Sequence, residues 1–186
     1  MPSRLLAPCR ALLLGLLPLA GTAQGLDYNI DEVRAHGAWH SLRLSLGEER
    51  HARALEASSY ADSTLSVNAT PGACDRPWLE LRVALAEVQA DSATVNRVPV
   101  DLLVDQGAVH TGEGAFLIER GDDGFYVRLS RLDTVALLDA MAAGETLRLR
   151  IHRAPEDYWF MAFDLTGFEA ARARMARLCR NADETP

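Results

Sequence analysis

The sequence predicts an α+β fold that is mainly β: an antiparallel β-sandwich or partly closed barrel with a C-terminal amphipathic helix. Segments in which apolar and polar residues alternate recur along the chain, which is typical of half-buried antiparallel strands. Near the C-terminus an aromatic segment runs into a helical pattern that ends at a cysteine. We expect about eight or nine strands, and short helices near residues 30–36, 131–142 and 167–180.

Residues 1–23 have the pattern of a secretory signal peptide. Arg4 and Arg10 precede the apolar run Ala11–Ala20, and small residues follow it. That run is shorter than the roughly 20 residues that a membrane-spanning helix needs. We therefore expect a protein exported to the periplasm, whose mature form, residues 24–186, is one β-rich domain without a transmembrane segment.

The chain is acidic, with 19 basic and 26 acidic residues and a formal net charge of −7. Removal of the signal peptide leaves 17 basic residues against 26 acidic ones, a net charge of −9. This balance argues against nucleic acid or anionic lipid as a partner. Every basic side chain is arginine, which we attribute to genomic base composition.

The mature chain keeps two cysteines, Cys74 and Cys179. Two cysteines in an exported domain predict one disulfide. It would close a loop of about 105 residues and stabilise the fold by roughly 4 to 5 kcal/mol in the chain-entropy model. The alternative is two free thiols with a redox role, but no Cys-x-x-Cys spacing supports it.

Residues 29–36 predict a short helix that Asn29 caps and Gly37 ends. His36 and His40 lie four residues apart with two carboxylates nearby, which leaves a metal site as an alternative. The glycine breaks the helix between the histidines, and the sequence places no third ligand. We expect neither a metal nor a cofactor.

Alternating segments predict strands through the middle of the chain, at Trp39–Leu46, His51–Ala57, Thr64–Asn68, Trp78–Leu85, Val98–Val104, Ala115–Arg120 and Phe125–Leu129. Glycines and aspartates at 121–124 predict a hairpin between the last two strands. Asp122 and Asp123 are too few oxygen ligands for a calcium loop. The glycine-rich segment 110–114 predicts a turn rather than a phosphate cradle, because neither a lysine nor a helix follows it.

Ser130–Ala142 predicts the first substantial helix, with Ser130 as its cap. In the next strand, Thr146–Arg153, alternation turns Leu147, Leu149 and Ile151 inward. The outward side chains are Arg148, Arg150 and His152. They are the candidate partner-binding residues, because arginine suits anion recognition and protein docking. The alternative is a solvated sheet face whose arginines pair with carboxylates on the neighbouring strand.

Tyr158–Leu165 is apolar on both faces, which predicts a central strand. Thr166 and Glu169 have the spacing of a capping box and predict the start of the last helix. The side chains expected on its buried face include Phe168, Met175 and Leu178.

The order of these elements resembles that in a loose group of Gram-negative periplasmic proteins, which includes the invasion-associated locus B type and the type VI secretion-associated periplasmic type. In these proteins a strand leads through a Phe-x-Leu-x-Gly turn into a helix that ends at a cysteine, here Phe163, Leu165, Gly167 and Cys179. Cys74 and the following Pro77-Trp78-Leu79-Glu80-Leu81 are similar to the corresponding segment of the secretion-associated type. The resemblance implies a periplasmic β-rich domain with an accessory role and no recognised catalytic residues.

These features together favour an exported accessory or binding protein that docks on an unidentified envelope protein, without catalysis. A hydrolase is an alternative, although the chain has neither a Gly-x-Ser-x-Gly elbow nor a His-Glu-x-x-His zinc motif. A carrier of a small apolar ligand is another, and a sizeable internal pocket would favour it.

Overall fold

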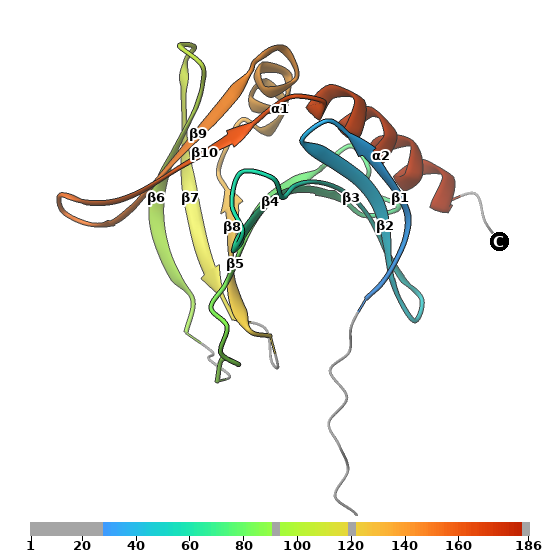
Figure 1. Cartoon of the computed structure of the whole chain (residues 1–186), viewed down its shortest axis with the longest axis horizontal. Helices are drawn as coiled ribbons and strands as arrows, with labels where there is room; N and C mark the ends of the chain where they lie inside the picture. The colour runs from blue at the N-terminus through green and yellow to red at the C-terminus, as the bar shows by residue number, and fades with distance from the viewer. Residues whose placement is uncertain (1–27, 91–93, 119–121, 184–186) are drawn as a thin grey trace, which may run out of the picture.

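The computed structural model describes residues 28–90, 94–118 and 122–183, which form ten antiparallel strands and two helices (Figure 1). The strands are β1 (Asn29–His36), β2 (Trp39–Leu46), β3 (Glu49–Glu56), β4 (Ser63–Ala69), β5 (Trp78–Ala84), β6 (Asn96–Val104), β7 (Val109–Leu117), β8 (Gly124–Ser130), β9 (Thr146–Ala154) and β10 (Asp157–Asp164). The helices are α1 (Thr134–Ala143) and α2 (Phe168–Asp183). The predicted signal peptide lies outside the described residues.

All ten strands belong to one sheet, in the order β1-β2-β3-β4-β5-β8-β7-β6-β9-β10. The sheet curves strongly, as Figure 1 shows, and its two ends approach each other without closing. The backbone N–H of Ala38, before β2, donates to the carbonyl oxygen of Thr166, after β10, over 3.0 Å. The predicted fold class is confirmed as a mainly β, antiparallel and partly closed arrangement with a C-terminal helix.

The core lies on the inner face of the curved sheet, where strand alternation directs the apolar side chains. In β9, for example, Leu147, Leu149 and Ile151 are all buried, as predicted. Helix α2 packs against β2, β3 and β4, beside the N-terminal half of the sheet (Figure 1). Neither helix of the described residues is long and apolar enough to cross a membrane.

The predicted disulfide between Cys74 and Cys179 is confirmed, with their Cα atoms 5.9 Å apart. It ties the connection between β4 and β5 to the C-terminal part of α2. At the other end of the helix, the Phe168 ring lies 4.6 Å from the Trp39 ring, and both side chains are fully buried. The helix is therefore held to the sheet at both of its ends.

The turn before α2 differs from the predicted capping box. The helix starts at Phe168, one residue later than that box requires, and the N–H of Thr166 donates to the Asp164 carboxylate over 2.7 Å. Gly167 has a φ of +89°, and a Cβ there would lie 1.4 Å from the His36 carbonyl oxygen. Because the β1–β2 turn comes this close, only glycine fits the position.

The prediction of a helix at residues 29–36 is wrong, because this segment is strand β1. It pairs with β2, with Ile30 opposite Leu44 and His36 opposite Trp39. A helix this short has little stability of its own, so pairing with β2 prevails over the local capping signals.

The prediction of a turn at residues 110–114 is also wrong, because these residues lie inside β7. A Cβ on Gly112 would come within 2.6 Å of the Ser130 carbonyl oxygen, and one on Gly114 within 2.9 Å of Val100. These glycines mark close packing around a strand, not a turn or a phosphate cradle.

Helix α1 begins at Thr134, later than predicted, because Ser130 belongs to β8. Asp133 is its cap and accepts the N–H of Ala136 over 3.1 Å. Strand β10 is an edge strand and not the predicted central one. One of its apolar faces is therefore exposed, since Tyr158 and Phe160 keep 41% and 65% of their surface accessible.

The close approach at Gly167 predicts a large effect of one methyl group. Gly167→Ala should lower the free energy of unfolding by more than about 3 kcal/mol, since the left-handed backbone alone costs about 1 to 2 and the contact with His36 adds to it. Gly47→Ala is the matched control: Gly47 has a φ of +58° but open space around it, so it should lose only the backbone cost. Urea unfolding of both variants gives the comparison, and equal losses would contradict the role assigned to the turn.

Candidate functional site

The three predicted binding residues lie in one row on the outer face of β9. This strand sits between β6 and β10, with Arg150 opposite Asp101 on one side and Phe160 on the other. Arg148 and Arg150 are exposed, and His152 is half-buried. Alternation along β9 brings all three to the same side of the sheet, opposite the core.

A half-buried carboxylate on β6 orients two of them. Asp101 Oδ2 accepts hydrogen bonds from Arg150, over 2.9 Å from Nε and 2.5 Å from the terminal nitrogen, and lies 2.7 Å from His152 Nε2. The Asp101 side chain is only 15% exposed. Its burial opposes ionisation, but the hydrogen bonds from His152 and Arg150 and their charge outweigh burial, so the pKa of Asp101 lies below its ordinary value.

Arg148 has a different environment. Its guanidinium donates to the carbonyl oxygen of Asp105 over 3.0 Å. The Asp105 carboxylate is engaged elsewhere, because it accepts the N–H groups of Glu145 and Thr146 over 3.0 and 2.9 Å. Among the residues that the structure describes, no carboxylate forms an ion pair with Arg148, so its charge faces solvent unmatched.

Two aromatic side chains of β10 continue the row. The Arg150 guanidinium lies 5.6 Å from the centre of the Tyr158 ring, and the His152 ring meets the same ring edge-on at 5.0 Å. The Phe160 ring follows 5.9 Å from Tyr158. We call Arg148, Arg150, His152, Tyr158 and Phe160 the basic–aromatic patch. The aromatic half was not predicted from the sequence, because a segment that is apolar on both faces is typical of a buried central strand.

A second polar cluster lies over β3, β4, β5 and β8, on the sheet face opposite the core. The Glu80 carboxylate, 7% exposed, accepts from Arg128 over 3.0 Å and lies 3.6 Å from Arg53. Arg53 also donates to Asn68 over 2.5 Å. Burial lowers the pKa of Arg53, against the opposing charge of Glu80. Two guanidiniums thus share one carboxylate on this face of the sheet.

Asp122 and Asp123 form ion pairs with an arginine side chain of the same chain. Arg82 reaches both carboxylates, over 2.6 and 2.5 Å, and the Tyr126 hydroxyl donates to Asp122. Burial raises the pKa of Tyr126 to about 12, and its hydrogen bond to Asp122 acts in the same direction. These side chains hold the ends of β5 and β8 together.

The two histidines considered for a metal lie on opposite faces of the β1–β2 hairpin, because His36 pairs with Trp39 and His40 with Ala35. His36 Nε2 lies 2.8 Å from the Ser41 hydroxyl. Burial and neighbouring positive charges lower the pKa of His36. In the described part of the chain, no group of three or more histidine, cysteine or acidic side chains is placed to bind a metal.

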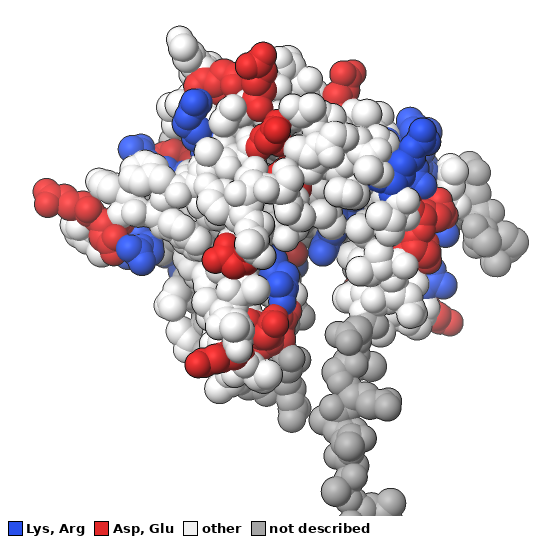
Figure 2. Space-filling model, viewed as in Figure 1, with Lys and Arg blue, Asp and Glu red and all other residues white. Residues whose placement is uncertain are grey.

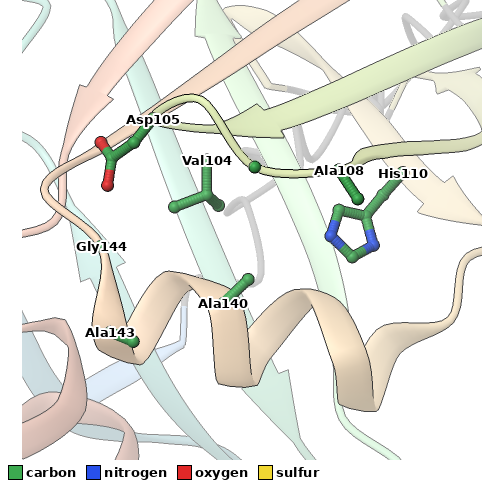
Figure 3. A pocket seen from close by; sticks show the side chains of 8 residues that line it. Val104, Asp105, Ala108, His110, Ala140, Ala143 and Gly144 are labelled. Carbon is green, nitrogen blue, oxygen red and sulfur yellow. The ribbon is translucent and has the colours of Figure 1, made fainter.

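Two of the surface depressions among the described residues are considered as ligand sites. One, of about 240 Å³, lies between α1 and the turn from β6 to β7, with Asp105 at one end and His110 at the other (Figure 3). The other, of about 300 Å³, lies beside Arg97, Glu113 and Arg131. Both are open to solvent and small, so neither is the internal pocket that a carrier would use.

The comparisons with known proteins show a likeness at the level of the fold. The crystal structure of invasion associated protein B from Bartonella henselae is similar with a TM-score of 0.56 and 20% sequence identity, over 80% of this chain and 97% of that one. No protein-family model matches the chain, and no curated protein matches it. The likeness supports the invasion-associated side of the resemblance in its fold, while the secretion-associated side stays a prediction.

The Asp101 network predicts a dependence of stability on pH. Because its pKa is lower in the folded state, ionised Asp101 stabilises the fold above the unfolded-state value near 3.9, and this contribution is lost as the pH falls through the folded-state pKa. Asp101→Asn should therefore be about 1 kcal/mol less stable than the native protein at pH 7 and nearly equal to it at about pH 2. Urea unfolding across this range measures the difference, and a constant gap would refute the assigned ion network.

Proposed function

We propose that this chain is an exported periplasmic accessory protein that docks on an envelope protein through the basic–aromatic patch, without catalysis. The observation that carries the proposal is the exposure of Tyr158 and Phe160 beside the arginine row. Aromatic residues and arginine are enriched in protein–protein interfaces, and contiguous exposed apolar groups mark such sites. In Figure 2 charges of both signs are interspersed over the visible face. No large surface of one charge is seen there, so the proposal rests on the local arrangement of side chains in the patch.

The side chains of the patch have distinct roles in this docking. Phe160 is the apolar anchor, because more than half of its surface is accessible. Asp101 and Tyr158 hold Arg150 in place, so less side-chain entropy is lost when a partner binds it. Arg148 supplies an unmatched charge for a carboxylate of the partner.

The setting in the envelope rests on other features. The signal-peptide pattern and the disulfide favour an oxidising compartment outside the cytoplasm. The similar solved structure belongs to a protein whose name associates it with invasion, which supports an accessory role at the cell envelope for this chain too. No observation in the described residues specifically favours the hydrolase or the carrier.

Crosslinking in the native envelope, followed by affinity capture and mass spectrometry, tests the proposal. Arg148→Glu with Arg150→Glu should lower the yield of a specific partner at least about tenfold, because both changes oppose the charge of the patch. Phe160→Ala should have a similar effect without disturbing Asp101. Arg76→Glu, a charge reversal at an exposed loop residue, is the control and should capture normally.

Urea unfolding of each variant separates lost docking from lost folding. Phe160→Ala should stay within about 0.5 kcal/mol of the native protein, since the ring is exposed. Normal capture by the patch variants would sink the proposal, as would the absence of any specific partner.

A further inference from the structure

Alternate backbone N–H groups of β10 point to its free edge, away from β9. The N–H groups of Ala162 and Asp164 point away from β9, because they donate to the Tyr60 hydroxyl and the Ser59 hydroxyl over 2.9 and 3.2 Å. The pairing of β10 with β9 is regular from Tyr158 to Asp164. Every second residue therefore has the same direction, and the backbone groups of Tyr158 and Phe160 also face the open edge.

The chain itself covers the C-terminal half of this edge. The loop after β3 supplies the Ser59 and Tyr60 hydroxyls, and buried Glu56 anchors that loop by accepting the N–H groups of Ser58 and Ser59, each over 3.0 Å. The Trp39 indole donates to the last carbonyl of β10 over 2.7 Å. Native proteins protect edge strands in such ways, because unpaired edges recruit other chains.

The N-terminal half of the edge is not protected in this way. In the described part of the chain, the N–H groups of Tyr158 and Phe160 have no hydrogen-bond partner. The side chains around them are apolar on both faces of the sheet: Phe160 on the outer face, and Trp159 on the inner face with the Phe125 ring 6.3 Å away. An added strand would complete the backbone pairing and cover these rings.

The two faces of the sheet beside this edge differ in charge. The outer face carries two arginines of β9. Arg148 has no carboxylate partner among the described residues, and Arg150 bonds to Asp101 of β6 while its guanidinium lies 5.6 Å from the centre of the Tyr158 ring. On the inner face the neighbours of this edge include the Trp159 and Phe125 rings. A segment in which carboxylates alternate with apolar residues would therefore match both faces.

We propose that the segment Tyr158–Phe160 binds an extended acidic–apolar segment of the docked partner as an eleventh strand of the sheet. This inference deepens the proposed docking function and rests on it. The added strand places its carboxylates on the outer face, the side of the sheet that carries Arg148 and Arg150, and its apolar side chains against Trp159 and Phe125. A second copy of this chain fits less well, because it would bring another arginine row to the same face.

A synthetic seven-residue peptide in which valine and glutamate alternate is the probe. We expect saturable binding to the ¹⁵N-labelled mature protein, and amide hydrogen exchange at Tyr158 and Phe160 slowed at least about tenfold. The amide of Trp159, which faces β9, is the internal reference and should change little.

Phe160→Pro should abolish peptide binding, because proline removes an edge N–H while the ladder with β9 uses the alternate residues. Phe160→Leu is the matched control: it keeps the N–H and an apolar side chain and should bind within about threefold of the native protein. If the proline variant does not fold, the native protein with a peptide N-methylated at alternate residues gives the same test.

Equal binding by Phe160→Pro or by the N-methylated peptide overturns the inference, as does unchanged exchange at Tyr158 and Phe160. If protection of these amides from exchange increases with protein concentration in the absence of peptide, a second copy of the chain binds at the edge. That result also overturns the inference. Partner capture that is lost on Phe160→Ala and on the reversal of Arg148 and Arg150, while the native protein binds no peptide, leaves docking intact and refutes strand addition alone. Peptide binding without any captured partner refutes the proposed function instead.

Discussion

The turn between β10 and α2 is the constraint on which the rest of the structure depends, because both ends of the open sheet meet there. Gly167 lets the β1–β2 turn come into contact with it, and Ala38 and Trp39 bond to the backbone around it. From this point α2 runs across β2, β3 and β4 and buries Phe168 against Trp39. A curved sheet that does not close leaves part of its core face open, so the helix is what completes the core.

The same arrangement determines which part of the β10 edge remains free to pair with another strand. Strand β10 is an edge of the sheet, and Trp39 with the loop after β3 covers only its C-terminal half. Glu56, buried without a positive partner among the described residues, organises the loop that covers it, through Ser58 and Ser59. The other half carries aromatic side chains toward solvent, at a place where proteins more often put a charge or a proline.

Much of this fold follows from local pattern and could be predicted from the sequence. Alternation locates β9 and the row from Arg148 to His152, and the count of cysteines gives the disulfide. The errors come where distant segments decide. Residues 29–36 have helix-capping signals but pair with β2, and the glycines of β7 are set by neighbouring side chains. Register across β6 and β9 brings Asp101 to Arg150 from 49 residues away, which no local pattern reveals.

The charged half of the patch alone does not separate a docking site from a solvated sheet face. Asp101 pairs with Arg150 and His152 as a solvated face would require, and such exposed pairs contribute little to stability. The aromatic half is different, because leaving Phe160 in water forgoes the roughly 1.5 to 3 kcal/mol that burial of such a side chain provides. Since the backbone of the same residue also faces an open edge, one added strand would bury the ring and pair the N–H together. Strand addition thus accounts for both the exposed Phe160 ring and its unpaired N–H, whereas a solvated sheet face accounts for neither.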